Sequence, residues 1–232
     1  MLLAPGASGP GAEPPLPLSD NPLVIVERSG ALPKIAPDAW VAPTATLVGN
    51  VSIGAGCVID HGALVVSGGP PIHLEAGVAV MAGAIIRSTG GFHRPAYDVP
   101  IGKDCLIGPQ AALVGCRLGE AVYVATGVMI FHGAHIGEGC RIGARGVVHA
   151  GAVLPPRSRV GMGQFAIAQP DGRPALVTGD LDAARTALAA SDFFGKVFGA
   201  DPSDPENLEA LHRQAARTVA SETRAFSDRL LE

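Results

Sequence analysis

The side chains of this sequence that could do chemistry are mostly imidazoles. Of its 7 His, His93, His132 and His149 are candidates for general acid–base catalysis, because imidazole changes its charge near neutral pH. His132 and His149 stand two and one positions after Ile130 and Val148, which belong to a regular pattern described below. A metal site formed by both with a neighbouring subunit is an alternative, although no ligand spacing supports it. An isolated His is also often structural or exposed to solvent.

Polar residues also gather in the segment 87–100, RSTGGFHRPAYDVP. Loops that project from a rigid scaffold often carry binding groups. This one places His93, a candidate general base, near Arg87 and Tyr97, which are candidate substrate-binding residues. The guanidinium of Arg87 has a fork that suits a carboxylate or a phosphate. Alternatively, Arg87 pairs with a local acid such as Asp98.

Gln110 is a further candidate for substrate binding, with a hydrogen bond to a neighbouring subunit as the alternative. Asp60 and His61 are adjacent in sequence, but neighbours on a strand point to opposite faces. We therefore do not expect them to form a catalytic dyad.

A repeat of six residues positions these side chains. Aliphatic residues recur at every sixth position from Ile35 to Val160, with two interruptions and a single five-residue step after Leu113. Neither a helix nor an ordinary strand has this period. It predicts an all-β solenoid of about seven triangular coils, in which each six-residue unit forms a short strand and a turn. The repeated residues are Ile35, Val41, Leu47, Ile53, Ile59, Val65, Leu74, Val80, Ile86, Ile101, Ile107, Leu113, Leu118, Val124, Ile130, Ile136, Ile142, Val148, Leu154 and Val160.

Small residues accompany the aliphatic ladder. The position after the aliphatic residue is often Gly, for which we expect a positive φ in the turn. Cys57, Cys105 and Cys140 occupy the fifth position of their units, which predicts small, inward-facing core residues rather than a metal or disulfide site. The glycines meant are Gly54, Gly102, Gly108, Gly119, Gly137 and Gly143.

The domain organisation follows from the limits of the repeat. Residues 1–21 form a flexible tail rich in Pro, Gly and Ala, and residues 22–34 cap the start of the solenoid. The solenoid itself covers residues 35–170. Residues 171–232 form a C-terminal cap with an amphipathic α-helix, predicted from Pro205 to the end, that packs on the solenoid.

Composition excludes several classes of function. The 232 residues are 47% hydrophobic and 16% charged, with 31 Gly and a net charge of −4. That charge gives no electrostatic footprint for nucleic acid. No apolar run approaches the length of about 20 residues that would span a membrane. The start of the chain lacks a signal-peptide pattern, so we expect a cytoplasmic protein.

The repeat resembles the left-handed parallel β-helix of the hexapeptide-repeat proteins, and within them the γ-class carbonic anhydrase-like family. The stretches WVAPTATLVGNVSIG and IGPQAALVGCRLGE carry this resemblance, including the five-residue step. It implies a homotrimer with active sites between neighbouring subunits. It also implies zinc held by three His.

The zinc ligands of that family are replaced in this sequence. Arg87, Pro109 and Val114 stand where the family has its three His. A catalytic zinc needs about three protein ligands and an open position for water. We therefore predict that zinc and CO₂ hydration are absent, and we predict no other cofactor.

Three functions remain open. The first is an enzyme, a lyase or a transferase, that kept the scaffold and acts on a small anionic metabolite in an inter-subunit cleft by acid–base and electrostatic catalysis. The second is an acyltransferase that uses acyl-CoA, with His93 as the general base. The third is a non-catalytic assembly or binding protein.

Overall fold

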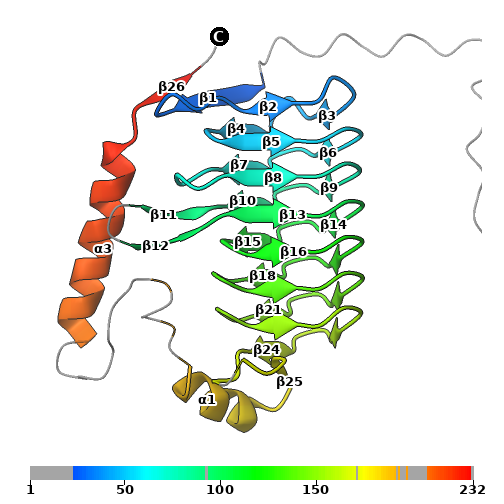
Figure 1. Ribbon diagram of the computed structural model, residues 1–232, viewed down its shortest axis with the longest axis vertical. Helices are drawn as coiled ribbons and strands as arrows, with labels where there is room; N and C mark the ends of the chain where they lie inside the picture. Colours follow the sequence, from blue (N-terminus) through cyan, green and yellow to red (C-terminus); the bar gives the residue numbers. More distant parts are fainter. Residues whose placement is uncertain are drawn as a thin grey trace, which may run out of the picture.

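The protein is a parallel β-solenoid, seen side-on in Figure 1, a computed structural model that describes residues 23–91, 94–170, 172–191, 193, 197 and 208–230. The predicted tail 1–21 and the candidate base His93 lie outside the described residues. Three sheets run along the solenoid, and we call their outer surfaces faces A, B and C. Faces B and C each have 7 strands, one from each coil, while the sheet of face A has 10. The prediction of a solenoid with about seven coils is confirmed.

Along the chain, each coil contributes one strand to face B, then one to face C and then one to face A. Face B contains β2 (Lys34–Ile35), β5 (Val51–Ile53), β8 (Ile72–Leu74), β13 (Val99–Ile101), β16 (Arg117–Leu118), β19 (His135–Ile136) and β22 (Val153–Leu154). Face C contains β3 (Trp40–Val41), β6 (Val58–Ile59), β9 (Ala79–Val80), β14 (Leu106–Ile107), β17 (Tyr123–Val124), β20 (Arg141–Ile142) and β23 (Arg159–Val160).

Face A carries the eighth parallel strand and both ends of the structure. Its order is β25-β24-β21-β18-β15-β10-β7-β4-β1-β26, of which the first and last strands are antiparallel to their neighbours. A separate antiparallel pair, β11 (Thr89–Gly91) and β12 (Arg94–Tyr97), projects after β10. The strands of face A are β1 (Val24–Arg28), β4 (Thr46–Val48), β7 (Leu64–Val66), β10 (Ile85–Arg87), β15 (Ala112–Val114), β18 (Met129–Ile130), β21 (Val147–Val148), β24 (Phe165–Ile167), β25 (Leu176–Thr178) and β26 (Asp228–Leu230).

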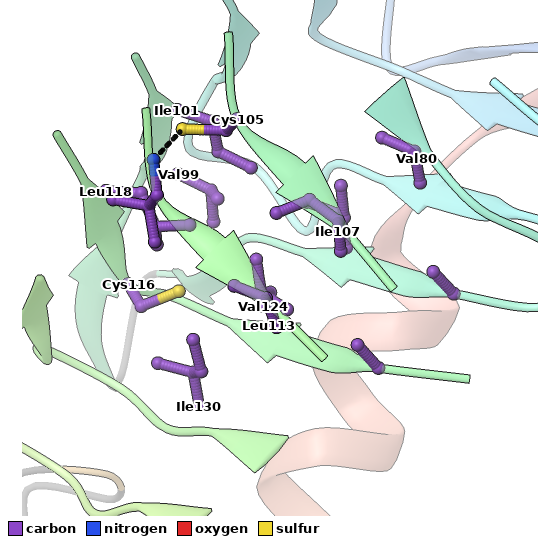
Figure 2. Close-up of a cluster of buried hydrophobic side chains, with 14 of the residues drawn as sticks. Val80, Val99, Ile101, Cys105, Ile107, Leu113, Cys116, Leu118, Val124 and Ile130 are labelled. Carbon is purple, nitrogen blue, oxygen red and sulfur yellow. Dashed lines mark hydrogen bonds between the residues drawn. The ribbon is translucent and has the colours of Figure 1, made fainter. Parts of the chain in front are cut away.

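The ladder residues form the core. Ile107 and Val124 are in register on neighbouring strands and are 0% exposed, and burial of each such side chain stabilises the fold by about 1.5–3 kcal/mol. Figure 2 shows how ladder residues of successive coils meet around Cys105 and Cys116. The four Cys are buried and free, as predicted for Cys57, Cys105 and Cys140.

The glycines that follow the ladder residues are required for a different reason from the one predicted. Positive φ angles occur two positions later, for example at Gly56 (63°) and Gly139 (65°), and not at the six predicted glycines. A Cβ on Gly137 would instead lie 2.5 Å from the backbone nitrogen of Pro156 in the next coil, and one on Gly54 2.8 Å from the backbone around Glu75. Close stacking of successive coils therefore excludes a side chain at these positions.

The C-terminal segment closes both ends of the solenoid. β25 pairs with β24 at one end, and α1 (Leu181–Ala189) follows, with Asp180 as its N-cap. α3 (Leu208–Ala225) then runs alongside the solenoid and brings β26 back to β1 at the other end (Figure 1). The predicted helix thus ends at Ala225, because residues 228–230 add a strand to the open edge of the sheet.

The C-terminal strand is fixed by ion pairs. Arg28 donates hydrogen bonds of 2.8 and 2.6 Å to the two carboxylate oxygens of Asp228, and its guanidinium lies 4.6 Å from the ring centroid of Phe226. Arg229 pairs with Glu27 at 2.6 Å. In the described part of α3, no stretch is long and apolar enough to cross a membrane, and the same holds for α1.

Candidate functional site

The candidate site lies on face A, where an outward column runs from coil to coil. Arg87 stands in this column between Val66 and Val114, with which it is in register on β7 and β15. The column continues through Phe131 and His149, each directly after a ladder residue. Ile86 is fully buried, so the alternation along the strand turns Arg87 outward. One cation therefore stands between two apolar residues of the column.

Arg87 is half-buried, and its Nε atom is inaccessible to solvent. Asp98, the example named for a local acid that could pair with Arg87, does not pair with it. Both carboxylate oxygens of Asp98 accept hydrogen bonds from Nη2 of Arg117, at 2.6 and 2.8 Å. The local acid is thus used to hold the end of β12 against face B, and it does not neutralise Arg87.

Tyr97 is packed against His132 at the corner between faces A and B. Their ring centroids are 5.7 Å apart with an interplanar angle of 70°. The Tyr97 ring lies over Gly115 and Gly133, where a Cβ would come within 2.6 and 3.0 Å of Tyr97 atoms. The amide of Gly115 donates to the carbonyl of Arg87 at 2.8 Å. Arg87 and His132 therefore lie two coils apart at the same corner, and Tyr97 lies over Gly115 of the coil between them.

His149 lies further along the column, among aromatic rings. Its ring centroid is 6.2 Å from that of Phe131 and 5.5 Å from that of Phe193. The Nδ1 atoms of His132 and His149 are both buried. The sequence reasoning missed both Phe residues. Phe131 could have been found because it follows the ladder residue Ile130, whereas Phe193 lies after α1 and carries no periodic signal.

Gln110 is not brought to this corner. It is exposed in the turn between faces C and A, with a φ of 57°, and its amide donates to the carbonyl of Ala82. The width of face A separates it from Tyr97. His61 likewise forms no dyad with Asp60, because its backbone amide donates to that carboxylate while its Nδ1 lies 2.8 Å from the hydroxyl of Thr44.

A zinc ion does not fit the residues at the family's metal position. Arg87 and Val114 occupy adjacent places in the column, and Pro109 lies in the turn before Gln110. None of these side chains is a zinc ligand. Among the described ranges, no three His, Cys, Asp or Glu side chains come together as a metal site.

The thiols do not supply a nucleophile either. Burial raises the pKa of Cys116 to about 12 and the pKa of Cys105 to about 11. Both therefore stay protonated at neutral pH, and a protonated thiol is a poor nucleophile. Their role is to fill the core.

Comparisons with known proteins agree with the repeat. A family model described as "Hexapeptide repeat of succinyl-transferase" matches residues 99–132 and 133–165. "Carnitine operon protein CaiE" of Escherichia coli K12 is 33% identical over 130 residues, which cover 53% of this chain and 60% of that protein. "Gamma carbonic anhydrase 1, mitochondrial" of Arabidopsis thaliana is 23% identical over 133 residues, or 57% of this chain and 46% of that protein.

The matched region thus spans about 60% of the length of the CaiE relatives. Among solved structures, a hexapeptide transferase family protein from Anaplasma phagocytophilum is similar, with a TM-score of 0.44 and 19% identity over 85% of this chain and 95% of that chain. The hexapeptide-repeat resemblance stated from the sequence is confirmed.

Proposed function

We propose that this protein, whose six-residue repeat folds as a left-handed parallel β-helix, is an enzyme acting on a small anionic metabolite at face A without zinc. The observation that carries this proposal is the position of Arg87. It places a permanent cation in the column that otherwise exposes Val66 and Val114. A guanidinium fork can hold a carboxylate or a phosphate through two hydrogen bonds.

A buried hydroxyl two residues further along the chain supports the proposal. Oγ1 of Thr89, two residues after Arg87, is buried and has no hydrogen-bond partner in the described part of the chain. A buried polar atom without a partner is unfavourable, and an anionic ligand on Arg87 could accept its hydrogen bond. Thr89 also pairs across the hairpin with Tyr97, the proposed substrate-binding residue next to His132.

The imidazoles supply proton transfer in this proposal. His132 stands at the same corner as Arg87 and is the first candidate for the general acid–base group. His149 is the second, and the ring of Phe193 lies against it. His93, which lies outside the described residues, is the third. Gln110 would act on a ligand only from a neighbouring subunit, because its own coil turns it away from Tyr97.

We propose a homotrimer whose neighbouring subunits complete the site. Large apolar side chains are exposed on face A and on the first four coils of face C, before Tyr123, which supports an interface at each of these places. Ile85 and Met129 are 41% and 44% exposed on face A, and Trp40, Val58 and Leu106 are 45%, 37% and 36% exposed on face C. The proposal also places the protein in the cytoplasm.

The test is anion binding by purified protein, with sizing and elemental analysis of the same sample. A panel of small carboxylates and organic phosphates, including carnitine because of the CaiE relative, is screened by thermal stabilisation, since a ligand that binds only the folded state raises its stability. Arg87→Gln should abolish the response, while Arg185→Gln on α1 should retain it. An equal response from both variants, or stoichiometric zinc with CO₂ hydration, would refute the proposal.

An acyltransferase that uses acyl-CoA is the second candidate. The family model that matches residues 99–165 is named for a succinyl-transferase, which favours this reading over a non-catalytic binding protein. Thermal stabilisation by acetyl-CoA or succinyl-CoA would support it, provided that the His93→Ala variant keeps this stabilisation and loses acyl transfer. No response to any anion or acyl-CoA, together with an intact oligomer, would support the non-catalytic alternative.

A further inference from the structure

The last coils of the solenoid carry a concentration of positive charge on face C and its corners. The chain has no Asp or Glu between Glu138 and Asp171, but it has four Arg there. All four are exposed, and none forms an ion pair within the described residues. We call them the arginine patch, and they are Arg141, Arg145, Arg157 and Arg159.

Two members of the patch stand directly side by side. Arg141 on β20 and Arg159 on β23 are in register on neighbouring parallel strands, which places their backbones about 4.8 Å apart. Like charges opposite each other destabilise a sheet. Glu138, the nearest acid in sequence, forms no ion pair with either of them. An external anion could neutralise both guanidinium groups at once.

The other two members occupy strained backbone positions. Arg145 and Arg157 have φ angles of 57° and 63°, in the left-handed region that favours glycine. Gly127 and Gly163 fill the same place as Arg145 in the coils on either side, and Gly139 fills the place of Arg157 in the coil before it. Gln110 and Ala121 take the same conformation in earlier coils of these two columns, so the solenoid turn itself sets this geometry, and Arg145 and Arg157 add charge at the two corners of face C.

An aromatic ring adjoins the patch on the same face. Tyr123 is in register with Arg141 on the neighbouring strand and is 46% exposed. Face C therefore presents a ring followed by two guanidinium groups, spaced by about 4.8 Å from strand to strand. A planar heterocycle stacks on an exposed ring of this kind, while two linked phosphates suit paired arginines.

We propose that the arginine patch and Tyr123 bind a ligand of the nucleoside diphosphate class. The phosphates lie on Arg141 and Arg159, with Arg145 and Arg157 at the two corners, and the ring of the ligand stacks on Tyr123. The site is separate from Arg87, which lies on face A several coils away. It is a second anion site, and it does not depend on the function proposed above.

The test is calorimetric titration of the full chain with ADP, inorganic pyrophosphate and adenosine at low ionic strength. ADP should bind most tightly, pyrophosphate more weakly and adenosine least. The double substitution Arg141→Gln with Arg159→Gln should weaken ADP binding by at least about tenfold, because it removes charge-assisted hydrogen bonds. Arg185→Gln, which removes an exposed arginine of α1 outside the patch, is the matched control and should leave the affinity unchanged.

A second variant separates the ring from the charges. Tyr123→Leu should weaken ADP binding by about tenfold, the loss of one stacking contact, and leave pyrophosphate binding unchanged. Circular dichroism and melting curves show whether each variant is folded. The proposal is overturned if ADP binds no better than adenosine, or if a folded double variant retains the affinity. It is also overturned if a polyglutamate peptide binds more tightly than ADP, because the patch would then be a surface for an acidic polypeptide.

Discussion

The ring of Tyr97 lies edge-on to the imidazole of His132, with centroids 5.7 Å apart, and rests on two glycines of successive coils. This contact joins the returning strand of the hairpin to the corner of the solenoid. The neighbouring residue, Asp98, is held by Arg117 at 2.6 Å. The hairpin is thus anchored at its base by one aromatic and one ionic contact, and the anchor places Tyr97 next to the column of Arg87.

Gly115→Ala should displace Tyr97 and lower the free energy of unfolding. A Cβ at Gly115 would lie 2.6 Å from Cβ of Tyr97, and the φ of 56° is unfavourable for alanine. We expect a loss of about 1–2 kcal/mol from the backbone conformation and about 1–3 kcal/mol more from the clash with Tyr97. Urea unfolding measures the total.

The matched control is Gly56→Ala. Gly56 has a similar φ of 63°, but nothing lies within 4 Å of its Cβ position. It should therefore lose only the backbone contribution. In a Tyr97→Gly background, which removes the contacted Cβ as well as the ring, Gly115→Ala should cost no more than Gly56→Ala. Equal losses for the two glycines in the unsubstituted protein would show that Tyr97 does not rest on Gly115.

Gly137→Ala should disturb the stacking of coils. Its Cβ would approach the backbone nitrogen of Pro156 to 2.5 Å, and a backbone atom cannot move aside as a flexible side chain can. We expect a loss of about 3 kcal/mol, at the upper end of the range for overpacking. Gly179→Ala is the control for the mere addition of a methyl group, because Gly179 has no positive φ and its Cβ would meet only side-chain atoms of Gln164, at 3.7 and 3.8 Å. A melting temperature of Gly137→Ala equal to that of the control would contradict this explanation.

These glycines show which features of the fold can be predicted from the sequence and which cannot. The six-residue ladder predicted the core and the faces, because the inward position is defined by a period that any reader can count. It did not reveal why Gly137 is glycine, since the approach of the next coil is a distance between residues far apart in the chain. The positive φ expected there occurs two positions later, as at Gly139.

Site residues could be placed from the sequence only where they stand directly after a ladder residue. Arg87 and His149 could be placed in one column because each directly follows a ladder residue. The contact of Tyr97 with His132 depends on the path of an inserted hairpin, which has no period. The partner of Asp98 was not predictable either, because Arg117 reaches it from the neighbouring strand of face B, whereas the alternative considered, Arg87, is in the same loop.

Alkaline conditions should destabilise the protein through its buried thiols. Burial raises the pKa of Cys116 to about 12 and that of Cys105 to about 11, from an ordinary value of 9.0. The unfolded chain loses these protons first, so the stabilisation is complete below pH 9 and is lost as the pH rises from 9 towards 12. Cys116→Ala should show a weaker decline of unfolding free energy with pH over this interval. Parallel curves for the two proteins would contradict the prediction.

The ion pair of Asp228 should give the opposite pH dependence. Hydrogen bonds from Arg28 lower the pKa of Asp228 below its ordinary 3.8, so its stabilisation is present above that pH and is lost as the pH falls below it. Asp228→Asn should lower the unfolding free energy at pH 7 by about 1 kcal/mol or less, since the carboxylate is partly exposed. The difference from the unsubstituted protein should vanish in acid. Faster amide exchange in β26 at pH 7 is the local readout.

Arg157→Gly should separate stability from binding in the arginine patch. Arg157 has a φ of 63°, and a non-glycine residue in that region is unfavourable by about 1–2 kcal/mol. Glycine removes this strain, and it also removes one of four neighbouring like charges. The variant should therefore melt at a higher temperature while it binds ADP more weakly. A lower melting temperature would mean that Arg157 makes a stabilising contact in the folded chain. A higher melting temperature with unchanged ADP affinity would remove Arg157 from the proposed site, because the strain would then serve no ligand there.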